Sequence, residues 1–293
     1  MKAVAAGLSE RGVVQGDVVG LLSPNSIDYP IALFGAQLIG ARVTTLNPLY
    51  TPTEICNQLV DAGATQLFCA TPMLDKAYAA VGLGAPISRV YALGDAAAAP
   101  PDGVSGPSLE SFSALLATSG APPAVTIDPA ADVALIPYSS GTSGLPKGVE
   151  LTHSNVVANV RQCEVEHVHL SPADTLVGVL PFYHIYGFTV ILNIALCAGA
   201  RVVTMPAFDP SLFLTVLKKH EVTVAHVAPP LVGFLAKHPA VDSVLPLPRL
   251  RELFSGAAPL GQELEDAARE ARLHRASGVR HDGGGAGDAH RAV

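Results

Sequence analysis

Short runs of aliphatic and β-branched residues alternate with helix-like segments along this chain, and this alternation most constrains its fold. Residues 18–23 (VVGLLS) predict a buried strand, and residues 26–39 carry apolar side chains at helical spacing. Further strands are predicted at 42–46 and 66–69. This order of elements indicates a mostly parallel sheet covered by helices, which is the α/β class.

The segment between the second and third predicted strands has the composition of a helix start. Thr51 and Glu54 have the spacing of a reciprocal capping box, and Pro52 occupies the first helical position. Two connections rich in alanine, proline and glycine, 95–107 and 119–129, flank a short helix predicted around 109–117. After them, strands are predicted at 133–138, 175–180, 201–205, 222–227 and 250–254, and helices at 154–167, 210–220 and 229–237.

The composition predicts a large core and excludes some partners. Of 293 residues, 49% are apolar and only 15% are charged, so most of the chain is expected to fold. The formal charge of −7 gives no basic surface for nucleic acid, which is therefore not an expected partner. An anionic ligand would have to be held by a local cluster of donors.

Several features indicate a cytoplasmic protein with no integral membrane segment. The first twelve residues lack a continuous apolar stretch and do not resemble a signal peptide. The most apolar run, 187–200, is interrupted by Asn193 and is too short to span a bilayer. Four cysteines without a CxxC pair are expected to be buried thiols in a reducing compartment: Cys56, Cys69, Cys163 and Cys197.

The most informative stretch is YSSGTSGLPKGVELTH, residues 138–153. Three hydroxyl groups, two glycines and a lysine gather within eight residues after a predicted strand: Ser140, Gly141, Thr142, Ser143, Gly144 and Lys147. Glycines let backbone N–H groups converge on an anion, hydroxyls add donors, and the lysine adds positive charge. The order is not the Walker pattern, because Gly148 follows Lys147. On residue types alone, an ordinary serine–glycine surface loop remains an alternative.

Three further motifs follow predicted strands. LPFYHIYG (180–187) puts His184 and Tyr186 on a loop, although a histidine beside aromatic residues also fits a packed core. VAPP (227–230) opens a helix, which by itself is a structural feature. SGAAPLG (255–261) ends another strand, and its small residues let a flat ring approach the backbone closely.

These motifs together resemble the adenylate-forming enzymes. SSGTSGLPKG is similar to the signature phosphate loop of acyl-CoA synthetases, luciferases and peptide-synthetase adenylation domains, and LPFYHIYG is similar to the LPxFHIYG segment of 4-coumarate–CoA ligases. VAPP and SGAAPLG also match family segments, in the family's order. The resemblance implies a layered α/β/α/β/α large N-terminal domain over residues 1–270, incomplete at both ends.

The resemblance implies an activity and a set of site residues. The family activates a small carboxylic acid with ATP and Mg²⁺, forming an acyl-adenylate and pyrophosphate, and then transfers the acyl group to CoA. The phosphates of ATP would be held by Ser139, Ser140, Gly141, Thr142, Ser143, Gly144 and Lys147, and the adenine would lie against Gly256, Ala257 and Ala258. The acid would meet His184, Tyr186, Gly256 and Ala258, and the implied catalytic residues are Thr142, Lys147 and His184. No side chain is expected to be a metal ligand.

Beyond residue 270 the resemblance stops, and the family's small C-terminal domain is absent. Residues 271–293 lack apolar periodicity and predict a disordered tail. Back-translated and read one base later, they permit a run containing the family's Gly-Tyr-Gly-Met-Thr-Glu motif, so a frameshift is predicted near Glu270–Ala271. Little ligase activity is therefore expected of this chain. The alternatives are a fatty acid substrate, a domain that loads a carrier protein, and a non-catalytic remnant or nucleotide-binding pseudoenzyme.

Overall fold

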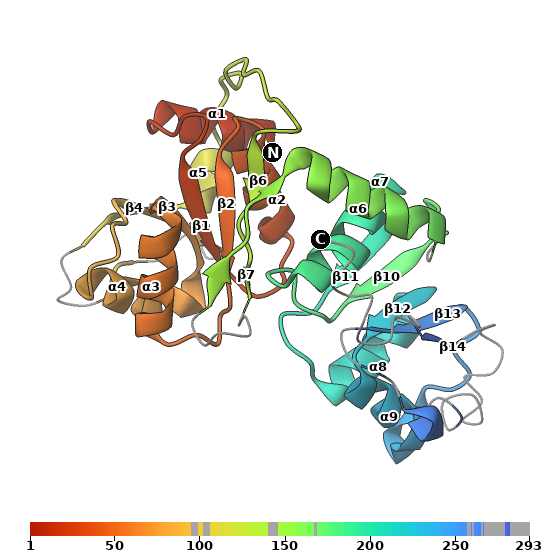
Figure 1. Ribbon diagram of the computed structural model, residues 1–293. Coiled ribbons are helices and arrows are strands. Elements are labelled where there is room, and N and C mark those ends of the chain that lie inside the picture. Colours follow the sequence, from red (N-terminus) through yellow and green to blue (C-terminus); the bar gives the residue numbers. More distant parts are fainter. Residues whose placement is uncertain are drawn as a thin grey trace. The chain divides into compact units, whose positions relative to one another are not determined.

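The computed structural model describes residues 1–94, 99–101, 106–139, 146–166, 169–256, 259, 261–264, 266 and 279–281. The chain divides into two compact units, Met1–Val157 and Ala158–Val293. Each unit has a sheet with helices packed on it, so the predicted α/β class is confirmed (Figure 1).

The first unit contains a seven-stranded sheet in the order β5-β4-β3-β1-β2-β6-β9. Its strands are β1 (Val18–Leu22), β2 (Arg42–Leu46), β3 (Ala64–Ala70), β4 (Arg89–Leu93), β5 (Ser108–Ser111), β6 (Val133–Leu135) and β9 (Leu151–Thr152). Neighbouring strands pair in parallel, except that β6 and β9 are antiparallel. The predicted parallel architecture is thus confirmed for this unit.

Helices cover both faces of this sheet. They are α1 (Lys2–Glu10), α2 (Asp28–Gln37), α3 (Pro52–Ala62), α4 (Leu74–Gly82) and α5 (Phe112–Leu116). On β3, Leu67 and Cys69 join the core formed with α3 and α4, which lie side by side in Figure 1. Phe68 points to the other face, where its ring packs on Tyr91 and Phe112 at centroid distances of 5.2 and 5.8 Å. Successive side chains of β3 point to opposite faces, so this one strand contributes to the core on each face of the sheet.

The start of α3 confirms the predicted capping box. The backbone N–H of Thr51 donates to Glu54 Oε2 at 2.7 Å, and the N–H of Glu54 donates to Thr51 Oγ1 at 3.3 Å. Gly63 ends the helix in the left-handed conformation with φ 68°. The helix predicted over 109–117 is wrong at its start, because β5 pairs with β4 there and α5 begins only at Phe112.

The second unit has a five-stranded parallel sheet in the order β11-β10-β12-β13-β14. Its strands are β10 (Thr175–Gly178), β11 (Arg201–Thr204), β12 (Val224–Val227), β13 (Glu252–Ser255) and β14 (Val279–His281). Helix α6 (His153–Glu166) leads into it, and a π-helix (Gly187–Asn193) precedes α7 (Ile194–Cys197), α8 (Pro210–Lys219) and α9 (Pro229–Lys237). On β13, Leu253 faces the core made by α8 and α9, while Phe254 faces the opposite core.

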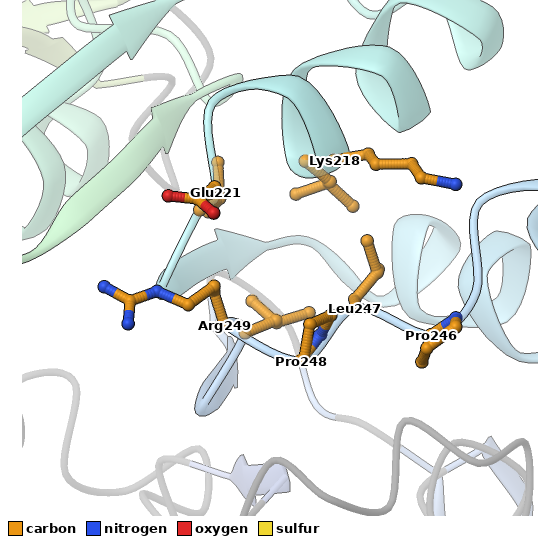
Figure 2. A pocket seen from close by; sticks show the side chains of 9 residues that line it. Lys218, Glu221, Pro246, Leu247, Pro248 and Arg249 are labelled. Carbon is orange, nitrogen blue, oxygen red and sulfur yellow. The ribbon is translucent and has the colours of Figure 1, made fainter.

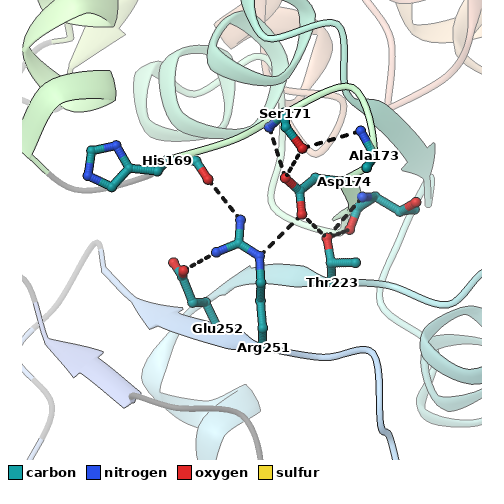
Figure 3. A network of polar contacts seen from close by, with 8 residues as sticks. His169, Ser171, Ala173, Asp174, Thr223, Arg251 and Glu252 are labelled. Atoms are coloured by element: carbon teal, nitrogen blue, oxygen red, sulfur yellow. Dashed lines mark hydrogen bonds and ion pairs between the residues drawn. The ribbon is translucent and has the colours of Figure 1, made fainter.

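A polar network ties together the amino ends of the strands in the second unit (Figure 3). Asp174 accepts hydrogen bonds from Ser171 N at 2.8 Å, Thr223 Oγ1 at 2.8 Å and Arg251 Nε at 3.2 Å. Burial raises the pKa of Asp174, but these hydrogen bonds outweigh burial and hold the pKa below its usual value. The network holds the amino ends of these strands together, and the loops carrying Tyr186 and Gly256 leave from the carboxyl ends.

The segment 271–293 is described only at Val279–His281. These residues form β14 and pair in parallel with β13, so the predicted absence of structure does not hold for them. The rest of the segment, including the proposed frameshift position, lies outside the described residues.

The prediction of four buried thiols holds for two of them. Cys56 and Cys69 are buried, whereas Cys163 is only partly buried and Cys197 is exposed. In the part of the chain that the structure describes, no helix has the length and apolar character needed to cross a bilayer.

Candidate functional site

Two short strands of the first unit flank the predicted phosphate loop in the sequence. They are β7 (Tyr138–Ser139) and β8 (Lys147–Gly148), which pair antiparallel as a hairpin so that Ser139 stands opposite Lys147. Both of these residues are exposed. The connecting residues lie outside the described part of the chain, among them the predicted Ser140, Gly141, Thr142, Ser143 and Gly144.

Helix α3 holds the base of this hairpin. The Tyr138 hydroxyl donates a hydrogen bond to Asp61 Oδ2 at 2.5 Å. Burial, and then the neighbouring carboxylate of Asp61, raise the pKa of Tyr138, so its phenol stays protonated and acts as a donor. A Cβ atom on Gly148 would lie 3.0 Å from the Tyr138 ring, so glycine lets the ring cover the opposite strand.

Residues Ser139 and Lys147 suit a polyphosphate. The hairpin brings a hydroxyl group and an exposed ammonium group to the two ends of a glycine- and serine-rich turn. Hydroxyl and ammonium donors are the side-chain groups that phosphate oxygens accept from. Among the described residues, no three His, Cys, Asp or Glu side chains gather in a way that would hold a metal. The hairpin thus offers two side-chain donors that a phosphate oxygen could accept from.

The predicted acid-binding residues gather in the second unit. Tyr186 and Gly256 come from the loops after β10 and β13, and a Cβ atom on Gly256 would lie only 2.2 Å from Tyr186 Oη. His184 is joined to Tyr186, because the backbone N–H of Tyr186 donates to His184 Nδ1 at 3.2 Å. The other predicted residues of this segment, Ala257 and Ala258, lie outside the described part of the chain.

Gly187 explains the sharp turn after Tyr186. A Cβ atom at Gly187 would lie 2.2 Å from the carbonyl oxygen of Pro181, which belongs to the backbone and cannot rotate away. The chain can therefore fold back on itself here only with glycine, and the π-helix then continues to Asn193. His184 and Tyr186 therefore lie in the loop immediately before the π-helix.

His184 is suited to donate a hydrogen bond rather than to accept a proton. Packing around its imidazole lowers its pKa from the usual value, although the residue as a whole is exposed. Nδ1 accepts the Tyr186 N–H, so the neutral ring carries its proton on Nε2. Nε2 is therefore available as a hydrogen-bond donor.

His226, which was not predicted from the sequence, lies on β12 beside Tyr186. Its ring stacks on Phe254 at a centroid distance of 4.9 Å and an angle of 10°. Nδ1 lies 3.5 Å from Tyr186 Oη, and the buried Nε2 has no hydrogen-bond partner among the described residues. Burial lowers the pKa of His226 to about 3, so the ring is neutral at physiological pH. The available sequence signal was a single polar residue in the apolar run VTVAHV.

A separate hollow of about 240 Å³ lies near the amino ends of β12 and β13, away from Tyr186 and Gly256. It is formed between the end of α8 and the segment before β13. Figure 2 shows Leu247 and Pro248 along its wall, with the charged ends of Lys218 and Arg249 directed to different sides. Since none of the predicted site residues lines it, this hollow is not part of the candidate site.

With this geometry, the chain can be placed among known proteins. Residues 1–279 match the family of AMP-binding enzymes, and the chain belongs to that family. Its sequence is 41% identical over 273 residues to a 4-coumarate-CoA ligase of Narcissus pseudonarcissus, covering 92% of this chain and 48% of the relative. It is 40% identical over 267 residues to a 4-coumarate-CoA ligase of Oryza sativa subsp. japonica, covering 90% and 47%.

Solved structures agree with this assignment. A long-chain-fatty-acid-CoA ligase from Archaeoglobus fulgidus superposes with a TM-score of 0.82 at 29% identity, covering 96% of this chain and 54% of that one. The ATP-bound MatB from Rhodopseudomonas palustris superposes with a TM-score of 0.75 at 27% identity, covering 92% and 50%. The predicted fold is therefore confirmed, and the chain spans about half the length of the relatives it matches.

Proposed function

We propose that this chain supplies the ATP- and acid-binding part of an AMP-forming acid–CoA ligase. The carboxylate of a small acid attacks the α-phosphorus of ATP, the bond to the β-phosphate breaks, and pyrophosphate leaves. The acyl-adenylate then transfers its acyl group to the thiol of CoA and releases AMP. Catalysis of the first step requires mainly positioning and neutralisation of phosphate charge.

The observation that carries this proposal is the β7–β8 hairpin. Ser139 and Lys147 are cross-strand partners at the ends of SSGTSGLPKG, so both can reach one phosphate chain. We assign the β- and γ-phosphates to this hairpin and to the backbone N–H groups and hydroxyls of 140–144, with Thr142 and Lys147 acting on the reacting phosphates. The likeness to the ATP-bound MatB of Rhodopseudomonas palustris supports the same ligand.

The acid is assigned to the second unit. Tyr186 and Gly256 form a close-packed wall, and His184 can donate from Nε2 to a carboxylate or phosphate oxygen. Ala258 and the adenine-binding Ala257 complete this assignment. The similarity to 4-coumarate-CoA ligases supports an aryl acid of the hydroxycinnamate kind. We propose the cytoplasm as the site of this reaction.

Nucleotide binding by the purified 293-residue chain tests this proposal. Calorimetric titration with MgATP is expected to show saturable 1:1 binding, and K147A should weaken it by about tenfold or more, because one charge-assisted hydrogen bond contributes on the order of 1.5–3 kcal/mol. K237A, which removes an exposed lysine of the second unit, is the matched control and should bind as the unaltered chain does. Absence of MgATP binding would contradict the proposal.

A fatty acid–CoA ligase is a second candidate, since the solved A. fulgidus structure is a long-chain-fatty-acid-CoA ligase. Pyrophosphate exchange into ATP, measured with aryl and long-chain acids, separates the two substrate classes. Exchange by this chain would also exclude a non-catalytic remnant or nucleotide-binding pseudoenzyme. Thioester formation with free CoA, by a longer protein carrying the alternative reading frame after Glu270, separates a CoA ligase from a domain that loads a carrier protein.

A further inference from the structure

Two residues of α3 hold the strand that leads into the phosphate hairpin. Gln58 and Asp61 are three residues apart and so lie on the same side of the helix. Gln58 Nε2 donates to Thr44 Oγ1 at 2.9 Å, and Thr44 Oγ1 donates to the carbonyl oxygen of Ile136 at 2.9 Å. Asp61 accepts from Tyr138 two residues later. The chain entering the hairpin is thus hydrogen-bonded to α3, through one buried relay and one direct bond.

The two attachments differ in what they control. The Gln58–Thr44–Ile136 relay is buried and ends on a backbone atom before the hairpin, so it belongs to the folded core. The Tyr138–Asp61 bond joins side chains, and Tyr138 is itself the first residue of β7. Tyr138 also covers Gly148 on β8, so its position sets where both hairpin strands lie against α3.

We propose that Tyr138 and Asp61 form a positioning pair that holds the β7–β8 hairpin on α3 and so sets the directions in which Ser139 and Lys147 reach a bound polyphosphate. Neither residue touches the phosphates in this assignment. The inference rests on the proposed function, because it needs ATP at the hairpin. It adds an element, α3, that the loop motif by itself does not contain.

The local chemistry suits such a role. A phenol that donates to a carboxylate forms a strong, directional hydrogen bond, and the Tyr138 hydroxyl has Asp61 as such an acceptor. Asp61 is exposed, so holding Tyr138 does not require burying this side chain. Replacing Tyr138 with phenylalanine keeps the ring over Gly148 and removes only the bond to Asp61.

A double-mutant cycle on MgATP affinity tests the pair. Y138F and D61A, each measured in the 293-residue chain by calorimetric titration, should raise the Kd for MgATP by about threefold to tenfold. This is less than the effect of K147A, because the pair acts on the ligand only through the hairpin. The double variant should bind no more weakly than either single variant, because both changes remove the same bond. D61N keeps an acceptor oxygen and should restore most of the affinity.

The matched control is Y78F. Tyr78 lies in the same unit, and its hydroxyl donates to the carbonyl oxygen of Pro107 at 3.1 Å, away from the hairpin. Y78F should lower the thermal unfolding temperature and leave the Kd for MgATP unchanged, which separates positioning from general loss of stability. If the unaltered chain binds MgATP and Y138F binds equally well, or if the effects of Y138F and D61A add, the positioning role is overturned. If the unaltered chain does not bind MgATP, the proposed function itself is overturned, and the positioning role is overturned with it.

Discussion

Replacing His226 with leucine should remove a specific pH dependence from the stability of the second unit. In the folded chain the pKa of His226 lies at about 3, whereas an unfolded histidine titrates near 6.5. Between these values the unfolded chain binds a proton that the folded chain does not. The contribution of this group is therefore complete above about pH 6.5 and is lost as pH falls toward about 3.

The size of the effect follows from these two pKa values. Proton linkage gives a loss of about 2 kcal/mol in the free energy of unfolding between pH 8 and pH 5, and of about 3 kcal/mol by pH 4. At pH 8 the substitution should change stability little. Leucine loses the stacking on Phe254, which stabilises the folded chain by about 1 kcal/mol. It also removes a buried nitrogen without a described partner, which destabilises the folded chain by a similar amount, so the two effects offset each other.

Hydrogen exchange of the β12 and β13 amides, measured from pH 8 to pH 4 and corrected for intrinsic exchange rates, reads the second unit by itself. The unaltered chain should lose protection more steeply than H226L over the acidic half of this range. H169Q, which replaces an exposed histidine, should follow the unaltered chain. Parallel curves for the unaltered chain and H226L would show that His226 gains its proton without unfolding, and would refute the reasoning.

Two further substitutions and one sequencing experiment have definite expected outcomes. T51A removes the side-chain half of the α3 capping box, in which Thr51 Oγ1 accepts from the Glu54 N–H, and should cost about 1 kcal/mol, read as faster hydrogen exchange in α3. G187A places a Cβ atom 2.2 Å from the carbonyl oxygen of Pro181 and should lower stability by roughly 2 kcal/mol or more, read by chemical denaturation, whereas G233A, with only a leucine side chain within 4 Å, should have little effect. DNA sequencing across Glu270–Ala271 should give codons that read Gly-Tyr-Gly-Met-Thr-Glu one base later, and incompatible codons would remove the frameshift hypothesis.

Most of the fold could be read from local pattern. The apolar strands β1, β2 and β11 lie within one or two residues of their predicted bounds, because a strand buried in a parallel sheet is recognisable by its own composition. β5 could not be found this way. Its sequence, SLES, is polar and half-buried, and it forms a strand because it pairs with β4 while Glu110 bridges Arg11 and Arg89. Those partners are distant in sequence.

The candidate site divides in the same manner. The motifs identified Ser139, Lys147, His184, Tyr186 and Gly256, because each belongs to a short string of unusual composition. The supporting residues were missed, since nothing local marks them. Asp61 is 77 residues before Tyr138, and His226 is 40 residues after Tyr186, so their roles depend on contacts that only the folded chain makes.

Each of the two units contains the same local arrangement among its candidate binding residues. In each, a tyrosine ring lies directly against a glycine of another segment, Tyr138 on Gly148 and Tyr186 on Gly256, and the hydroxyl group reaches a polar side chain at the far end of the ring. The glycine sets how closely the ring approaches, and the polar partner sets its direction. In the Tyr138 pair the ring contacts Gly148 and the hydroxyl contacts Asp61, so Y138F and G148A perturb direction and distance independently. In the Tyr186 pair the hydroxyl oxygen itself lies nearest to Gly256, so G256A perturbs both. A site assembled from such pairs is positioned by residues outside its signature motifs.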